Sequence, residues 1–419
     1  MTSIAQAVSC LDDYDPDALR VDKALEAIRA CLVPVAEAET LPLREGLGRV
    51  LAQQIVPAIN VPGHDNSAMD GFAVRSSDFK NEESRLKQVG TALAGKPFSG
   101  KVNAGECVRV MTGAVMPQGA DSVVVQEVCH ADGTSITIPP GQKAGQNVRA
   151  AGEDLKAGVA VLQPGQELRA AEIGLIASLG IGEVKVRRRL RVAFFSTGDE
   201  LASIGTPLAP GQVYDSNRYT LHGMLSRFGV EIIDMGVVRD DPALLEAAFR
   251  KAAASADAII TTGGVSVGEA DFVKQLMGKL GEVLFWKIAM RPGRPMAFGK
   301  IGKAFLFGLP GNPVAVMVTF YQFVRDALLV LGGRTGSFEI PLLNAESQTA
   351  IRKVPGRTEY QRGILFREGG EWKVRTTGQQ GSGVLRSMSE ANCFIVLEHE
   401  RGKVEAGELV GVQLMEGLA

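Results

Sequence analysis

The sequence has almost no net charge. Its 419 residues include 45 Lys and Arg against 47 Asp and Glu, which gives a formal net charge of −2. A chain without a global basic field is not expected to use nucleic acid or an anionic membrane as its main partner. Any anion that the protein binds must therefore be held by a local site.

Long apolar runs are also missing. No window approaches the roughly 18 uninterrupted apolar residues of a membrane span. The first thirty residues lack a continuous apolar core and carry an aspartate cluster, which is unlike a secretory signal. The aspartates are Asp12, Asp13, Asp15 and Asp17. We therefore expect a cytoplasmic protein.

Cysteine and histidine are scarce. The five cysteines are widely spaced without a Cys-x-x-Cys pair, and the four histidines are isolated. This pattern argues against a disulfide framework, a zinc site, and a Ser/His/Asp or Cys/His catalytic arrangement. Neither G-x-G-x-x-G nor the G-x-x-x-x-G-K-[ST] P-loop occurs. We expect reduced thiols, no covalent catalysis, and no nicotinamide, flavin or haem.

Glycine is in excess, with 49 of 419 residues, and it gathers at turns. From Leu190 onward, apolar strand-like runs are mostly separated by amphipathic helical stretches. The runs are RVAFFST, VEIIDMGVV, ADAIITTGG, VLFWKIAM and KAFLFGL. Continuous apolar strands joined by right-handed crossovers predict an α/β domain with a doubly wound sheet at residues 188–333, with part of residues 1–19 added.

The remaining chain is expected to form three further parts, so the fold class is multidomain α/β and β. Short alternating runs broken by glycine predict a small β domain at residues 61–139. It is inserted into an extended linker domain of residues 20–60 and 140–187, which begins with a helical pattern. Short strands and turns at residues 334–419 predict a C-terminal β barrel. The basic residues at 187–191 precede a buried strand, which favours a solvated face over a nucleic-acid patch.

Polar or glycine-rich turns follow four of the predicted strands. In an open α/β sheet the ligand crevice lies at the carboxyl ends of the strands, so these turns should converge on one rim. They are Thr197-Gly198-Asp199-Glu200, Arg239-Asp240-Asp241, Gly263 to Asp271, and Leu309-Pro310-Gly311-Asn312-Pro313.

The residue types on this rim predict a phosphate site with a metal. Glycines at 263, 264 and 268 leave backbone amides free to approach a phosphate, and a helix beginning near Asp271 adds its positive end. The rim carboxylates would repel a phosphate unless a divalent cation such as Mg²⁺ lay between them. Lys287, Arg291 and Arg294 follow the next strand and could hold further anionic groups.

Structural roles stay open for single motifs. An acid before a helix is often an N-cap, so Asp271 is explained about equally well as a cap or as a ligand. Either Asp240 or Asp241 could be the functional carboxylate. The polar segment at residues 61–72 has the composition of a binding loop or of successive turns. The Thr112 hydroxyl could donate to an anion, but that turn taken alone is better explained as structural.

Five motifs together resemble the molybdopterin molybdenumtransferases, the family of MoeA and the gephyrin E domain. The match runs in order over nearly the whole chain. Two of the motifs, GGVSVG and LPGNP, are partly shared with molybdopterin-adenylylating proteins, which lack DNSAMDG and the flanking β domains. The five are DNSAMDG from Asp65, MTG from Met111, STGDEL from Ser196, TGGVSVG from Thr262 and LPGNP from Leu309.

The resemblance implies a homodimer whose cleft joins the α/β domain of one subunit to the β domain of the other. The implied enzyme takes adenylylated molybdopterin and molybdate, with Mg²⁺, and yields molybdenum cofactor and AMP. Contact with the adenylyltransferase is also expected. His64 stands where the family commonly has an aromatic residue. The implied catalytic residues are Asp65, Thr112, Glu200, Asp240 and Asp271, with metal binding by Glu200, Asp240 and Asp271. The substrate-binding residues would be Asn66, Ser67, Asp70, Gly263, Gly264, Ser266, Gly268, Lys287, Arg291, Pro310, Asn312 and Pro313.

Two other functions fit parts of the pattern. The shared GGVSVG and LPGNP turns would also suit an adenylyltransferase acting on free molybdopterin with ATP. A dimeric scaffold of the gephyrin E-domain type would tolerate changes in the rim acids, but those acids are all present in this sequence.

Overall fold

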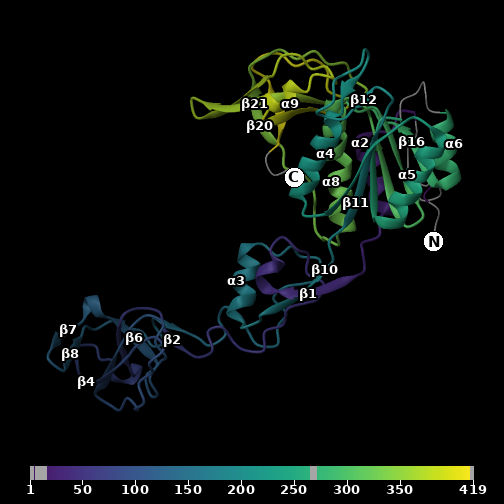
Figure 1. Ribbon diagram of the computed structural model, residues 1–419. Coiled ribbons are helices and arrows are strands. Elements are labelled where there is room, and N and C mark those ends of the chain that lie inside the picture. The colour runs from purple at the N-terminus through teal and green to yellow at the C-terminus, as the bar shows by residue number, and fades with distance from the viewer. Residues whose placement is uncertain (1–3, 5–16, 265–270, 416–419) are drawn as a thin grey trace. The chain divides into compact units, whose positions relative to one another are not determined.

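The computed structural model describes residue 4, residues 17–264 and residues 271–415. The chain forms two compact units (Figure 1). Unit 1 contains the chain up to Glu39, residues Gly48–Val50 and the chain from Arg187 onward, and unit 2 contains Thr40–Leu47 and Leu51–Val186. The chain therefore leaves unit 1, builds unit 2 and returns.

A six-stranded sheet forms the centre of unit 1, in the order β14-β11-β15-β19-β18-β16. The first four are parallel to their neighbours, whereas β18 is antiparallel to β19 and β16 to β18. A tight turn joins β18 to β19, and such a short connection can only pair strands antiparallel. The bounds are Glu231–Val238 (β14), Arg191–Thr197 (β11), Ala258–Thr262 (β15), Ala304–Leu309 (β19), Pro295–Ile301 (β18) and Gly281–Lys287 (β16).

Helices cover both faces of this sheet (Figure 1). Successive residues of β11 point to opposite faces, so Val192 and Phe194 enter one core while Ala193 and Phe195 enter the other. The first core contains α2 (Val21–Cys31), α4 (Ser216–Arg227), α7 (Pro313–Thr319) and α8 (Arg325–Leu331), and the second contains α5 (Pro242–Ser255) and α6 (Asp271–Leu280). The predicted doubly wound domain is confirmed, with an antiparallel edge.

Helix α2 packs into the core of unit 1, although we expected residues from 20 onward to belong to the linker domain. Its Ala24, Ala27 and Ile28 are buried there.

In the described part of the chain, Pro313–Leu331 is long and apolar enough to cross a membrane, but 67% of it is buried in the structure, as in a core helix.

A closed β barrel forms the C-terminal part of unit 1. The order β21-β22-β20-β24-β23 closes because β23 also pairs with β21, which confirms the predicted barrel. The two-residue strand β17 (Met290–Arg291) pairs with β21 and joins the barrel to the chain segment after β16. The barrel strands are Leu343–Ser347 (β20), Thr358–Glu368 (β21), Glu371–Thr376 (β22), Cys393–Leu397 (β23) and Leu409–Leu414 (β24), and α9 spans Arg386–Glu390.

Unit 2 has an extended part and a β part. The extended part contains most of β1 (Ala38–Pro42) and β10 (Glu183–Arg187), which pair, and α3 (Ala170–Ser178). The β part is a six-stranded sheet in the order β6-β3-β5-β4-β8-β7, beside the short pair β2 (Asn66–Ser67) and β9 (Val148–Arg149). Its strands are Gly71–Val74 (β3), Ser84–Ala92 (β4), Glu106–Val110 (β5), Ser122–Val125 (β6), His130–Asp132 (β7) and Ser135–Ile138 (β8).

In the basic run at residues 187–191, which we expected to form a solvated face, Arg188 and Arg191 form ion pairs. Arg188 donates to both carboxylate oxygens of Asp257 at 2.7 Å and also pairs with Glu37. Burial acts to raise the pKa of Asp257, but the hydrogen bonds from Arg188 and from the Arg191 amide outweigh it and lower that pKa. These contacts bind the chain segment before β11 to the start of β15.

The described cysteines are unpaired, as the sequence indicated. Burial raises the pKa of the Cys107 and Cys393 thiols to about 12. A thiol with so high a pKa is protonated at neutral pH and is a poor nucleophile.

Candidate functional site

A cavity of about 630 Å³ opens at the carboxyl ends of β11, β15 and β19, and we call it the cleft. Its walls come from the strand-end turns, from the chain after β16 and from two loops of the C-terminal barrel. The rim predicted from the sequence thus gathers around one space. The predicted residues that line it are Glu200, Asp240, Gly263, Gly264, Arg291, Pro310 and Asn312.

Glycine is required where β15 enters the cleft. Gly263 has a φ of +87°, and a Cβ at this position would lie 2.5 Å from the carbonyl oxygen of Thr197. The Gly263 N–H donates to the carbonyl oxygen of Leu309 at 3.2 Å. Because any side chain would push these backbones apart, the glycine lets three strand ends meet closely.

A side chain of α4 holds the turn after β19 in position. Asn217 is 6% exposed, and its Nδ2 donates to the carbonyl oxygen of Gly311 at 2.7 Å. Pro313 is the first residue of α7, where its fixed φ suits a helix start. Pro310 and Asn312 therefore face the cleft from a turn whose position depends on a buried side chain.

The structure separates the roles of the two adjacent acids after β14. The Asp241 carboxylate caps α5, accepting hydrogen bonds from the Ala243 and Leu244 amides at 2.9 Å. Asp240 lines the cleft together with Glu200. An N-cap side chain is committed to its helix, so Asp240 is the better candidate for contact with a ligand.

Arginines line the cleft together with these acids. Arg291 and Arg294 line it after β16, and Arg357 lines it from the barrel. Sequence analysis missed Arg357, although an arginine before a predicted strand next to a Pro-Gly turn was a weak signal. Its guanidinium is held at 2.8 Å by Glu359, which is 2% exposed. A cation on a buried carboxylate is fixed in direction, which suits recognition of an anion.

Some predicted residues lie elsewhere or outside the described residues. Lys287 is not among the residues that line the cleft, and its Nζ pairs with Asp17 at 2.6 Å. Ser266 and Gly268 lie outside the described residues, and nothing is described of the Asp271 side chain. In the part of the chain that is described, no three acids, cysteines or histidines gather as a metal site.

The predicted residues of unit 2 form a second cluster. The Asp70 carboxylate accepts hydrogen bonds at 2.7 Å from both the amide and the hydroxyl of Thr112. These hydrogen bonds lower the pKa of Asp70, the amide having the larger effect. The Gly113 amide donates to the Ser67 carbonyl oxygen at 2.8 Å. The DNSAMDG and MTG motifs therefore lie side by side, and the Thr112 hydroxyl already donates its proton to the Asp70 carboxylate.

Asp65 and Asn66 complete this cluster. One Asp65 carboxylate oxygen accepts from the Ala151 amide at 2.8 Å, and its side chain is exposed. The Oδ1 of Asn66 is buried without a hydrogen-bond partner among the described residues. An exposed carboxylate beside a buried, unsatisfied amide oxygen leaves hydrogen-bonding capacity for a ligand.

Known proteins match this chain along most of its length. Family models described as "MoeA N-terminal region (domain I and II)", "Probable molybdopterin binding domain" and "MoeA C-terminal region (domain IV)" match residues 19–180, 193–329 and 344–415. A molybdopterin molybdenumtransferase of Haemophilus influenzae is 45% identical over 94% of this chain and 98% of its own. The chain belongs to the molybdopterin molybdenumtransferase family. It is thus an enzyme of the family that the five motifs indicated.

A solved structure and a further sequence relative agree with this family assignment. A molybdopterin biosynthesis moeA protein from Pyrococcus horikoshii OT3 is 29% identical with a TM-score of 0.82, over 95% of this chain and 100% of that one. Gephyrin of Dictyostelium discoideum is 32% identical over 93% of this chain and 61% of its own length. The multidomain fold of this chain is therefore the fold of its family.

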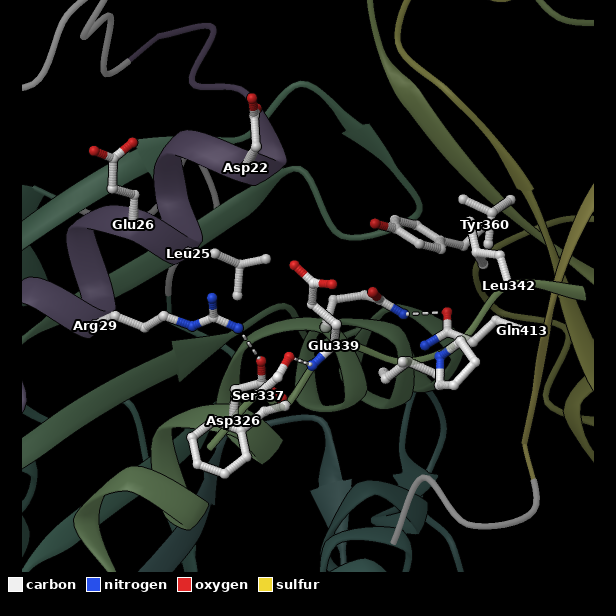
Figure 2. Close-up of a pocket in the computed structure, with 15 residues that line it drawn as sticks. Asp22, Leu25, Glu26, Arg29, Asp326, Ser337, Glu339, Leu342, Tyr360 and Gln413 are labelled. Carbon is white, nitrogen blue, oxygen red and sulfur yellow. Dashed lines mark hydrogen bonds and ion pairs between the residues drawn. The ribbon is translucent and has the colours of Figure 1, made fainter. Parts of the chain in front are cut away.

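A larger cavity, of about 920 Å³, lies between α2, the segment after α8 and the barrel (Figure 2). In Figure 2, Arg29 reaches Asp326. The Gln322 Nε2 donates a hydrogen bond to the Gln413 Oε1 at 3.0 Å. None of the predicted site residues lines this cavity. Volume alone thus does not identify the catalytic centre, and the convergence of acids, arginines and glycine amides favours the cleft.

Proposed function

We propose that this enzyme inserts molybdenum from molybdate into adenylylated molybdopterin, releasing AMP and forming molybdenum cofactor. The observation that carries the proposal is the cleft, where carboxylates, three arginines and glycine amides line one space. A pterin nucleotide has several phosphate charges, and molybdate is itself an anion. Both substrates need fixed cations and backbone amides, which this cleft provides.

Arginine geometry supports anion binding in the cleft. In the described part of the chain, Arg291 and Arg294 have no ion pair that would occupy them, whereas Arg357 is held by one carboxylate. A guanidinium offers paired N–H donors that match phosphate and other tetrahedral oxyanions. We propose that these three arginines hold the phosphates and the molybdate.

The carboxylates fit a bound Mg²⁺. This ion is usually held by one or two carboxylates, substrate phosphates and water rather than by a complete protein cage. Glu200 and Asp240, which line the cleft, would hold it. When bound, Mg²⁺ would neutralise charge between these acids and the phosphates. The chain's own groups orient the substrate: Gly264 offers its amide, Gly263 holds the strand ends close together, and Pro310 and Asn312 shape the wall.

A single-turnover assay with purified adenylylated molybdopterin and molybdate tests this proposal. We expect Asp240→Asn to slow AMP release and molybdenum insertion by about 100-fold or more, because a cleft carboxylate is lost. Asp241→Asn is the matched control: the same charge change beside the same strand, at a helix cap. Equal rates in Asp240→Asn and wild type would refute the assignment of this cleft as the active site.

Product analysis separates the alternative functions. The motifs shared with adenylylating proteins favour one rival, an adenylyltransferase that would make adenylylated pterin from ATP and free molybdopterin. Incubation with these two substrates distinguishes it, because our proposal predicts no such product. A dimeric scaffold is the other alternative, favoured by the gephyrin relative. It would show no turnover at all.

We also propose a homodimer whose cleft combines unit 1 of one chain with unit 2 of the other. Its support is that the predicted acids fall in both units, Asp65 in unit 2 and Asp240 in unit 1. Mixing inactive Asp65→Asn with inactive Asp240→Asn should restore up to about a quarter of wild-type activity, because half of the mixed dimers' sites are intact. No recovery in a refolded mixture that contains mixed dimers would contradict the shared cleft.

Two wider predictions accompany this function. We propose direct contact with the adenylyltransferase that supplies adenylylated molybdopterin, and a pull-down between the purified proteins tests it. A cytoplasmic location stays a prediction, and fractionation of cells expressing the native protein would test it.

A further inference from the structure

A buried lysine lies in the chain segment that leads to Arg357, the arginine that the barrel contributes to the cleft. This segment, residues 352–356, comes directly before Arg357 and β21. Lys353 is 7% exposed, whereas the other residues of the segment are exposed. Lys353 is therefore the side chain that can anchor this segment to the barrel.

The Lys353 ammonium group binds the backbone of two segments. Its Nζ donates to the carbonyl oxygens of Arg401 at 2.6 Å, His399 at 3.2 Å and Val354 at 3.5 Å. An ammonium group has three N–H donors, so all three are used. His399 and Arg401 belong to the turn after β23, in which the Arg401 amide donates to the Glu398 carbonyl oxygen at 3.1 Å. Lys353 thus joins residues 352–356 to this turn.

The hydrogen bonds of Lys353 are directed, and they are made without an ion pair among the described residues. A buried ammonium group is costly unless hydrogen bonds or an opposite charge compensate it. Burial lowers the pKa of Lys353, and the carboxylate charge of Glu359 opposes this effect. Because neutral carbonyl oxygens accept all its hydrogen bonds, the ammonium group is favourable only where these oxygens stand in the right places. It therefore fixes the two segments relative to each other.

The same contacts lead to the cleft. The His399 carbonyl oxygen that accepts from Lys353 also accepts from the Gly356 amide at 3.0 Å. Gly356 has a φ of +99° and directly precedes Arg357. Arg357 lines the cleft, and the Glu359 carboxylate holds its guanidinium at 2.8 Å. One carbonyl oxygen thus connects the lysine with the point at which the Arg357 side chain leaves the backbone.

We propose that Lys353 is a positioning residue, whose ammonium group holds residues 352–356 on the turn after β23 and so fixes the Arg357 guanidinium in the cleft. Lys353 itself is not among the residues that line the cleft. It acts through Arg357. The inference rests on the proposed function, because it requires Arg357 to bind an anionic group of the substrate.

A double-mutant cycle on the full chain tests this route. The single-turnover rate of AMP release is measured against the concentration of adenylylated molybdopterin, which gives the half-saturating concentration. Lys353→Met keeps the length of the side chain and removes its charge, and we expect a rise of about tenfold, because one charge-assisted contact to the substrate is weakened. In an Arg357→Gln background the same change should have less than about a twofold effect, since the residue through which Lys353 acts is gone.

Lys373→Met is the matched control. It makes the same chemical change on β22 of the same barrel, where Lys373 pairs with Glu368 at 2.7 Å. Lys373 does not line the cleft, and none of its described contacts reaches Arg357. Its half-saturating concentration should equal that of wild type.

Two further measurements separate positioning from stability. Lys353→Ala leaves a space that matches n-propylammonium, so this ion should raise the melting temperature of the variant and also restore the half-saturating concentration to within about threefold of wild type. It should do neither in Lys353→Met, where the side chain fills the space.

The position of Arg357 can also be measured without turnover. Phenylglyoxal modifies arginine side chains, and mass spectrometry resolves the rate at each one. Arg357 should react at least about threefold faster in folded Lys353→Met than in wild type. Arg375, exposed on β22, is the internal reference and should react at the same rate in both.

Three results would overturn the inference. The first is a Lys353→Met effect that is as large in the Arg357→Gln background as in wild type. The second is n-propylammonium that stabilises Lys353→Ala but leaves its half-saturating concentration unchanged, since the lysine would then serve stability alone. The third is an unchanged rate of Arg357 modification in folded Lys353→Met. A wild-type protein that releases no AMP would instead refute the proposed function, while Arg357 modification would still test the role of Lys353.

Discussion

Replacing Gly263 by alanine should damage both stability and catalysis, and the structure allows the two contributions to be estimated. A non-glycine residue at positive φ costs about 1–2 kcal/mol. A Cβ placed 2.5 Å from the Thr197 carbonyl oxygen and 2.9 Å from its Oγ1 must also displace the backbone. Such overpacking costs about 1–3 kcal/mol more. The sum for Gly263→Ala is about 2–5 kcal/mol.

A matched variant isolates the contact from the backbone strain. Gly302, in the turn between β18 and β19, also has positive φ, at +60°, but a Cβ at this position would have no atom within 4 Å. Gly302→Ala should therefore cost only the strain of about 1–2 kcal/mol. At about 2–4 °C per kcal/mol, the melting temperature should fall by roughly 2–8 °C in Gly302→Ala and roughly 4–20 °C in Gly263→Ala.

Thermal unfolding followed by circular dichroism measures the stabilities, and the single-turnover assay measures the chemistry at a temperature where both variants are folded. We expect Gly263→Ala to lose at least about tenfold in rate, because the displaced turn moves the neighbouring residues that line the cleft. Gly302→Ala should react like wild type. If the two variants lose the same stability and the same activity, the close approach of Gly263 to Thr197 has no functional role.

Three further predictions concern other contacts. Thr112→Val should raise the pKa of Asp70, measurable by NMR titration, because the hydroxyl hydrogen bond is lost while the amide bond remains; an unchanged pKa would contradict this. Asn217→Ala should lower kcat more than it raises KM, since it releases the turn at Gly311, and Asn217→Asp, which lacks the donor, should not rescue it. The folded-state pKa of Asp257 is lowered, so its stabilising effect is present above the unfolded pKa of about 3.9 and is lost as pH falls through the folded value. The urea midpoints of Asp257→Asn and wild type should differ at pH 7 and converge below about pH 4, and a gap independent of pH would argue against the ion pair.

The alternation of apolar runs with helical patterns was enough to predict the α/β domain, because strands buried on both faces need continuous apolar sequence. The same reasoning missed β18 (Pro295–Ile301). That strand begins at Pro295, directly after the turn that contains Pro292 and Gly293, and its burial depends on pairing with β19. The local sequence of a strand does not determine which other strand it pairs with.

The site residues also fall into those that the sequence could place and those that it could not. Glu200, Gly263 and Pro310 could be placed on one rim from their positions after predicted strands, since the ends of parallel strands meet at one edge. Asp240 and Asp241 are identical in type and adjacent in sequence, so only the cap geometry of α5 could separate them. Such a choice depends on hydrogen-bond direction, which composition cannot encode.

By itself, the sequence determined that this is a near-neutral multidomain protein, it predicted local anion sites, and its five motifs determined the family. These are properties of composition, periodicity and residue order along the chain. Only the tertiary structure decided that Lys287 pairs with Asp17 and does not line the cleft, and that Arg357 reaches the cleft from the barrel. The reason is physical: charge effects depend on burial and distance, and both arise only when segments far apart in sequence are packed together.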